Sequence, residues 1–397
     1  MAAAALLSGA AIFMTASCQN NYDMGTYGYD ANLLADCGIE TVELSSPDGK
    51  SRILVVPCWQ GRVLTSTTEG SEGISYGWVN AEFIRSGENN PQFNSWGGEE
   101  RFWLGPEGGA GSWFFKKGDA QVYANWKVPA VMNTDAFEVY SREAGKLSMG
   151  RKVSLLNASD VRFEMELKRD VTLLDRAQVS CLLGIELPKD AKVVAYRTDN
   201  TILNDGDSAW TRETGVPSVW LLGCFNPTRT TTVFIPYETL SEGPVVKDDY
   251  FGKLPSERLV VRDGFIFFKI DGEYRAKIGL PKGRAKDLVA SYDRQSHVLT
   301  ILKYSLPAGE AEYVNSQWGL QDDAFGGDVI NSYNDGPTDT GVIMGPFYEI
   351  ETSSPGAFLA PGQSLTHTQF TLHIQGNEQD VLSIIKSVFG LDSVMEF

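Results

Sequence analysis

A long series of short β-rich segments, separated by turns of Gly, Asn, Asp and Pro, runs through this chain and limits the folds that it can adopt. Segments such as 161–167, 230–235 and 298–302 are rich in Val, Ile, Thr and Phe, the side chains that suit a pleated, half-buried surface. Apolar residues recur at helical spacing near the C-terminus, over 378–388. The sequence therefore predicts an all-β fold, a large antiparallel β-sandwich with a short C-terminal helix.

The organisation of the chain points to one large unit. No Pro/Ser-rich linker or repeat of fixed period divides residues 31–397. Hydrophobic residues make up 42% of the 397 residues and aromatic residues 11%, which is enough apolar surface for a large core. We expect a single domain over 31–397, preceded by a polar tether over 19–30.

The N-terminus has the pattern of an export signal. Residues 2–14 are apolar and small, and Thr15-Ala16-Ser17-Cys18 follows them, as in a lipobox. The apolar stretch is shorter than the roughly 20 residues that a membrane-spanning helix needs. We expect a signal peptide over 1–18, lipidation of Cys18, and anchoring at the periplasmic face or outer surface of a bacterial cell envelope. A plain secretory signal is the alternative, because no Lys or Arg precedes the apolar run.

The charge balance excludes some partners. The formal net charge is −17, and no cluster of Lys and Arg is present to neutralise phosphates, so nucleic acid is not an expected partner. No EF-hand or zinc-ligand spacing occurs, and we expect neither a metal nor a cofactor. The sequence leaves open whether Cys37, Cys58, Cys181 and Cys224 are free thiols or form disulfides.

Three stretches carry a family resemblance. They are 53–79 with its Gly61-Arg62 turn, 96–109 with two Gly-Gly pairs, and 349–374, where Glu351 precedes Leu359-Ala360-Pro361-Gly362. In order and character they resemble the opening strand pair, Gly-Gly segment and closing hairpin of the galactose mutarotase (aldose 1-epimerase) superfamily, and within it a family of exported bacterial lipoproteins of unknown activity. The resemblance implies a mutarotase-like supersandwich, a sugar ligand and a catalytic role for Glu351.

The histidines depart from the pattern of that superfamily. Mutarotases present two active-site histidines early and midway along the chain, whereas here His297, His367 and His373 all lie late. The resemblance therefore implies the fold more strongly than it implies epimerase chemistry.

The closing hairpin offers an acid–base pair. Mutarotation needs one group to take the proton of the anomeric hydroxyl and another to protonate the ring oxygen. Glu349 and Glu351 share a strand face, and a turn at 359–362 would bring Glu351 close to His367. We predict Glu351 and His367 as catalytic residues, with Arg101 assisting. The alternatives are a solvated strand face, and histidines that only hydrogen-bond within a polar sheet face.

Sugar binding needs aromatic rings together with polar groups for the hydroxyls. The structural alternatives are that the aromatic residues are core anchors, that Arg101 pairs with Glu99 or Glu100, and that residues 331–337 form only a turn. Lys277 has apolar strand neighbours that could lower its pKa, although a charge at a strand edge is the simpler interpretation. The predicted ligand-binding residues are Trp96, Trp103, Glu107, Asn331, Tyr333, Asn334 and Glu349.

These expectations converge on a carbohydrate. The sequence favours an envelope-anchored accessory protein that binds or processes a mono- or oligosaccharide. The first alternative is an aldose or uronate epimerase or mutarotase that uses Glu351 with His367 or Arg101. The second is a structural envelope lipoprotein without a small ligand.

Overall fold

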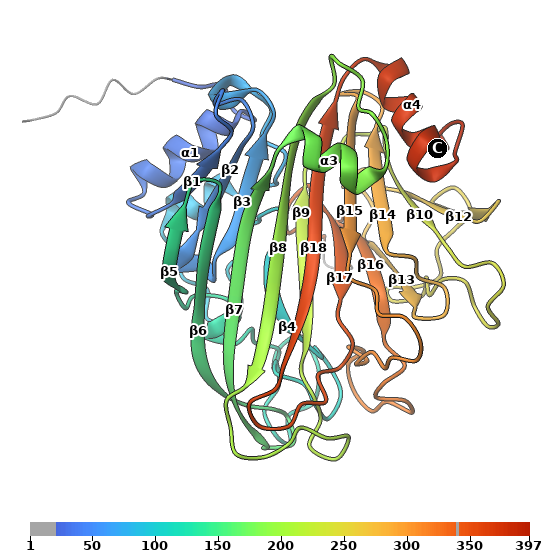
Figure 1. Ribbon diagram of the computed structural model, residues 1–397. Coiled ribbons are helices and arrows are strands. Elements are labelled where there is room, and N and C mark those ends of the chain that lie inside the picture. The colour runs from blue at the N-terminus through green and yellow to red at the C-terminus, as the bar shows by residue number, and fades with distance from the viewer. Residues whose placement is uncertain (1–20, 339–340) are drawn as a thin grey trace, which may run out of the picture.

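The computed structural model describes residues 21–338 and 341–397 and consists mainly of antiparallel sheets (Figure 1). It confirms the predicted all-β sandwich with a short C-terminal helix. The predicted signal peptide over 1–18 and its Cys18 lie outside the described residues.

The largest sheet has ten strands and forms the front layer in Figure 1. Its strands, in spatial order, are β11 (Leu259–Arg262), β12 (Phe265–Lys269), β10 (Thr231–Pro236), β14 (Leu288–Asp293), β15 (Val298–Tyr304), β18 (Ser364–Gln375), β8 (Lys192–Asn204), β7 (Arg162–Leu174), β6 (Lys146–Leu156) and β5 (Glu138–Glu143).

A five-stranded sheet packs behind it, and a three-stranded sheet lies at the N-terminal side. The five-stranded sheet has the order β13 (Ala276–Pro281), β16 (Asp328–Asn334), β17 (Tyr348–Ser353), β9 (Ser218–Phe225) and β4 (Arg101–Gly105). The three-stranded sheet consists of β1 (Val42–Ser45), β2 (Arg52–Val56) and β3 (Arg62–Thr67).

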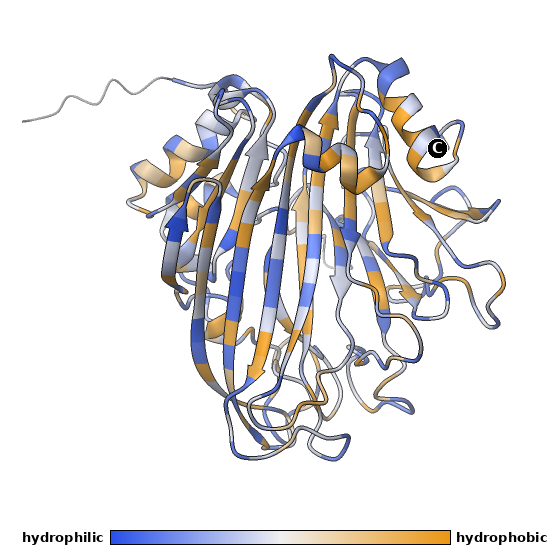
Figure 2. Cartoon of the chain, in the orientation of Figure 1, coloured by the Kyte–Doolittle hydropathy of each residue, from blue (hydrophilic) through white to orange (hydrophobic). Residues whose placement is uncertain are grey.

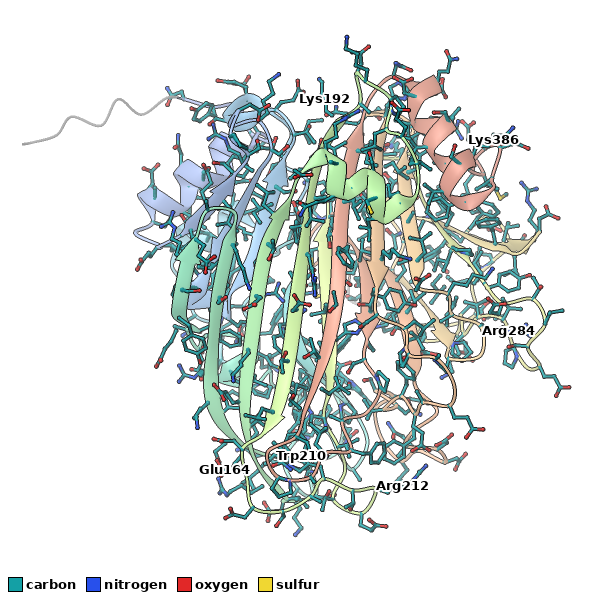
Figure 3. All side chains as sticks on the ribbon, in the orientation of Figure 1. Glu164, Lys192, Trp210, Arg212, Arg284 and Lys386 are labelled. Atoms are coloured by element: carbon teal, nitrogen blue, oxygen red, sulfur yellow. The ribbon has the colours of Figure 1, made fainter. Side chains whose placement is uncertain are left out.

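The long central strands of the ten-stranded sheet alternate between an inner and an outer face. On β7, Phe163, Met165 and Leu167 are buried, while the residues between them are more exposed, the pattern of a sheet with one face on a core. Figure 2 shows this alternation as bands of colour along the strands. In Figure 3, Lys192 at the start of β8 and Trp210 beyond its end mark how far this strand runs.

The predicted C-terminal helix is confirmed as α4 (Glu378–Phe389). It packs Val381, Ile384 and Ile385 into a core cluster with residues of the ten-stranded sheet. The structure has further short helices that the sequence pattern did not indicate. They are α1 (Tyr27–Asp36), α2 (Ala81–Ser86), α3 (Arg176–Leu183) and the 3-10 turns η1 (Pro57–Trp59), η2 (Gly70–Glu72) and η3 (Ala130–Met132).

The predicted tether over 19–30 is too long at its C-terminal end. Helix α1 begins inside it, because the Thr26 side chain caps the helix by accepting a hydrogen bond from the amide of Tyr29. Tyr27 is 1% exposed and Asp30 is also buried, so residues 27–30 belong to the folded domain.

Over residues 21–338 and 341–397, no helix has both the length and the apolar composition to cross a membrane.

The four cysteines in these ranges are free: Cys224 is buried, Cys58 half-buried, and Cys37 and Cys181 exposed. Cys181 lies on α3.

A polar layer lies between the ten-stranded sheet and the segment that leads into β4. Arg169 and Glu100 are fully buried there, and Arg169 Nη2 lies 2.8 Å from Glu100 Oε1. The other oxygen of Glu100 accepts from Gln369 Nε2 at 2.7 Å, and His373 Nε2 lies 3.2 Å from the Glu99 carboxylate. These contacts join the ten-stranded sheet to the segment before β4, and they supply the partners that buried charges need in a water-poor interior.

Candidate functional site

The outer face of the five-stranded sheet carries two rows of side chains in register. Residues directly opposite each other on paired strands, and residues two apart on one strand, share a face. The first row is Arg101, Leu222, Glu351, Asn331 and Gly279. The second row is Cys224, Glu349, Tyr333 and Lys277.

This face points away from the ten-stranded sheet. On β17 the alternate residues Tyr348 and Thr352 reach that sheet, where Tyr348 bonds to Ser291 at 2.7 Å and Thr352 to His367 Nε2 at 2.9 Å. Glu349 and Glu351 therefore project from the opposite side of β17, as their spacing had predicted.

Two ion pairs occupy the outer face. Arg101 hydrogen-bonds to the Glu349 carboxylate, and Lys277 Nζ lies 3.0 Å from both carboxylate oxygens of Glu351. The indole of Trp220 donates to Glu351 Oε2 at 2.8 Å. Strands β4, β13 and β17, distant in sequence, thus bring opposite charges together at one place.

Glu107 reaches the same place from the loop that follows β4. Its Oε1 accepts from Trp126 Nε1 at 2.9 Å, and its carboxyl group also hydrogen-bonds to Trp318. Burial raises the pKa of Glu107 to about 7; Lys277 opposes this shift and the charge of Glu351 reinforces it. Glu107 therefore exchanges its proton near neutral pH. We call Arg101, Glu107, Lys277, Glu349 and Glu351 the sheet-face cluster.

The other ionisable groups of the cluster are shifted as well. Burial lowers the pKa of Lys277, but the carboxylates of Glu351, Glu107 and Glu349 outweigh burial and raise it overall. Burial raises the pKa of Glu349, and Arg101 counteracts part of that shift. The earlier idea of a lowered Lys277 pKa is therefore wrong, because three carboxyl groups lie near its ammonium group.

The cluster is shielded but not closed. Glu351 is 1% exposed, whereas the side chains of Glu349 and Lys277 keep 12% and 17% exposure. Partly desolvated charges are costly to a fold unless they are paired, and shifted pKa values concentrate at functional sites. This cluster is therefore the candidate active site.

The structure brings several predicted residues together. Arg101, Glu107, Glu349 and Glu351 belong to the cluster, and Arg101 pairs with Glu349 instead of Glu99 or Glu100. Two more predicted residues, Asn331 and Tyr333, flank Glu351 and Glu349 in register.

Trp103 lies beside the cluster as a buried support. The Arg101 guanidinium carbon stands 5.1 Å from the centre of the Trp103 ring, and only 3% of Trp103 is exposed. Trp103 therefore packs beneath Arg101 as a core anchor, which was the structural alternative for this residue.

His367 does not join Glu351, and this prediction is wrong. β17 and β18 follow each other in the sequence, but they lie in different sheets and do not form a hairpin. The His367 ring bonds to Thr352 and Ser305 between the sheets, on the side of β17 opposite to Glu351. Burial lowers the pKa of His367 to about 3, so it stays neutral. The alternative is confirmed for both residues: His367 and His373 hydrogen-bond within a polar sheet face.

Trp96 and Asn334 are also placed elsewhere. Trp96 stacks on Trp59 at 4.2 Å in the core beside α1, because its segment folds against β3 and not onto the outer sheet face. The Asn334 amide donates to Asp271 and to the carbonyl of Tyr274. Asn334 therefore stabilises the loop that contains Asp271 and Tyr274. The interpretation of 331–337 as only a turn is wrong for residues 331–334, because they belong to strand β16.

Sequence reasoning missed part of the site. Trp220 gave no signal, since it stands in a continuous apolar run on β9. Lys277 did give a signal, because it is the single charged residue within the strand Ala276–Pro281. Its partner could not be predicted, because Lys277 and Glu351 lie on strands separated by β16. Among the described residues, no group of three or more His, Cys, Asp or Glu is arranged to hold a metal ion.

Comparisons with known proteins agree on the fold. The chain resembles the Slr1438 protein of Synechocystis sp. PCC 6803 with a TM-score of 0.52 and 12% identity, covering 85% of this chain and 96% of that one. It also resembles a galactose mutarotase related enzyme from Lactobacillus acidophilus (TM-score 0.47, 9% identity, 85% and 98% covered). For a galactose mutarotase-like protein from Lactobacillus casei ATCC 334 the TM-score is 0.44 and the sequence identity is 10%, and the match covers 85% of this chain and 99% of that one. Among curated proteins, none matches by sequence.

The sheet topology and the likeness to Slr1438 describe one class of protein, a large all-β sandwich. At 12% identity this likeness speaks for the fold alone. The chain belongs to DUF6786, a family of unknown function, whose sequence profile matches residues 25–395.

Proposed function

We propose that this protein binds a carbohydrate at the sheet-face cluster and processes it there. The observation that carries the proposal is the convergence of Arg101, Glu107, Lys277, Glu349 and Glu351 on one partly exposed sheet face. The fold adds support at a coarser level, since mutarotase-related structures are among those that it resembles.

The reaction that suits the cluster is proton exchange at a sugar ring. Glu351 would take the proton of the anomeric hydroxyl while the C1–O5 bond breaks and the ring oxygen receives a proton. Glu107 suits the donor role, because its pKa of about 7 lets it give up and regain a proton near neutral pH. Lys277 holds its own proton more tightly, so we assign it to orienting Glu351. Reclosure of the ring on either face would return both protons and exchange the anomers.

Binding without turnover is the second candidate. It is favoured by the contacts of Glu351, whose two oxygens both face Lys277 Nζ and one of which also accepts from Trp220. A sugar hydroxyl would have to share or displace these donors before Glu351 could act as a base.

A sugar screen tests the proposal. We expect an aldose or a uronate to raise the thermal unfolding midpoint, because a ligand that binds only the folded protein stabilises it. Anomeric exchange of that sugar, followed by NMR, should then be faster with the protein than without it. A sugar that binds while its anomers exchange at the uncatalysed rate would support the binding function, and failure of every sugar would contradict both.

We also propose that the protein is anchored at a cell envelope through a lipid on Cys18. The support is the apolar run over 2–14 followed by Thr15-Ala16-Ser17-Cys18. Membrane fractionation of cells that express the Cys18→Ser variant should show the protein moving from the membrane to the soluble fraction. Retention of that variant in the membrane would contradict the proposal.

A further inference from the structure

Three aromatic side chains lie beside the sheet-face cluster and are not needed for the proposed proton exchange. The Tyr123 ring is stacked on Trp126 with 6.1 Å between centroids and 16° between planes. Trp318 is stacked on the same Trp126 at 6.4 Å and 25°. We call Tyr123, Trp126 and Trp318 the aromatic platform.

The platform is held in place by hydrogen bonds between two loops. Gln121 Oε1 accepts from the amide of Gly109 at 2.8 Å and from that of Gly319 at 2.7 Å, and Gln121 Nε2 donates to the Gly109 carbonyl. In Figure 1 these loops, after β4 and before β16, lie at the same lower end of the sandwich. The rings are therefore ordered before any ligand arrives, which lowers the entropy lost on binding.

The platform is open on its outer side. Tyr123 is 67% exposed, and its sequence neighbour Val122 is 50% exposed. Leu320 is 105% exposed and follows Gly319, which hydrogen-bonds to Gln121. The buried member, Trp126, is 8% exposed and supports Tyr123 from below. Large apolar side chains that gather on a surface mark a binding site more often than isolated ones do.

Glu107 connects the platform to the cluster. Its carboxyl group accepts from Trp126 and hydrogen-bonds to Trp318, while Lys277 and Glu351 lie close enough to shift its pKa. A ligand placed at Glu351 and Glu107 thus has the platform rings immediately beside it.

We propose that the ligand is a carbohydrate chain of two or more units, with one ring at the sheet-face cluster and the next on the aromatic platform. This inference rests on the proposed function and names its substrate class. An aromatic ring fits the apolar face of a pyranose, and Tyr supplies that surface with little entropy to lose. A single sugar held at Glu351 would leave Tyr123 unused.

A chain-length series tests the inference. The probes are glucose, galactose and glucuronic acid, with di- and tetrasaccharides of the same series, titrated calorimetrically into the full chain. We expect the oligosaccharide of one series to bind roughly 10-fold or more tightly than its monosaccharide, because stacking on the platform adds about 1.4 kcal/mol or more of binding free energy. Equal affinity across the series, or no binding by any probe, overturns the inference.

The Tyr123→Ala variant locates the effect. It should weaken oligosaccharide binding roughly 2- to 10-fold and leave monosaccharide affinity unchanged. Tyr140→Ala is the matched control, since Tyr140 is 50% exposed on β5, in the other sheet. Two results for Tyr123→Ala would contradict the platform. One is an equal loss of affinity for mono- and oligosaccharides, and the other is a changed oligomeric state with unchanged sugar affinity.

The outcomes separate this inference from the proposed function. A monosaccharide that binds and exchanges its anomers, with no gain from added units, overturns the platform alone. An oligosaccharide whose binding depends on Tyr123, but whose anomeric exchange is unchanged in Glu351→Gln, supports the platform and contradicts the proposed site of reaction.

Discussion

The Glu351→Gln variant is expected to lose turnover of its sugar by a factor of about 10²–10⁴, the usual contribution of a positioned general base. The amide can still accept from Trp220 and Lys277, which bond to the carboxylate in the native protein, so binding should survive. A loss of turnover with binding retained identifies a group that acts on the transition state.

The measurement is anomeric exchange by NMR, with affinity from calorimetry on the same samples. Glu164→Gln serves as the control, because Glu164 is exposed on the outer face of the ten-stranded sheet, as Figure 3 shows. Unchanged exchange in Glu351→Gln would exclude Glu351 as the base.

The pH profile of the native protein should add a second signature. As the proton donor, Glu107 loses its proton when the pH rises through its raised pKa of about 7, so turnover should fall above that pH. Glu107→Gln should lower turnover and remove this limb of the profile.

Arg169→Met is expected to lower the free energy of unfolding by about 3–5 kcal/mol, the range for breaking a buried ion pair by removing one partner. Arg169 and Glu100 are both 0% exposed. Without the guanidinium, the Glu100 carboxylate would stay in the interior with only neutral donors, Thr198 and Gln369 among them. Arg169 also donates to the carbonyl of Gly61 at 2.9 Å, and that bond would be lost.

Urea unfolding of the two proteins measures this effect. The control is Lys152→Met, which breaks the exposed pair of Lys152 with Asp205 and should cost less than about 1 kcal/mol. The double variant Arg169→Met with Glu100→Gln should recover part of the loss, since no buried charge is left alone. Equal stability of Arg169→Met and Lys152→Met would contradict a stabilising role for the buried pair.

The alternation of residues along single strands was predictable. Glu349 and Glu351 share one face of β17, and His367 and His373 share the inner face of β18, as their spacing of two or a multiple of two requires. The apolar spacing of Val381, Ile384 and Ile385 likewise predicted α4. Helix α1 was not predicted, because it is short and its N-cap residue, Thr26, lies within a polar segment.

The amino-acid sequence alone predicts which side chains share a face of each strand, because that follows from the two-residue period of the backbone. Which faces meet depends on how the strands pair across the whole molecule. This pairing places β17 and β18 in different sheets and so separates Glu351 from His367. It also aligns β13 with β16 and β17, so that Lys277 reaches Glu351. The physical reason is that strand pairing joins segments far apart in the chain through interactions over the whole sheet, and no local spacing encodes them.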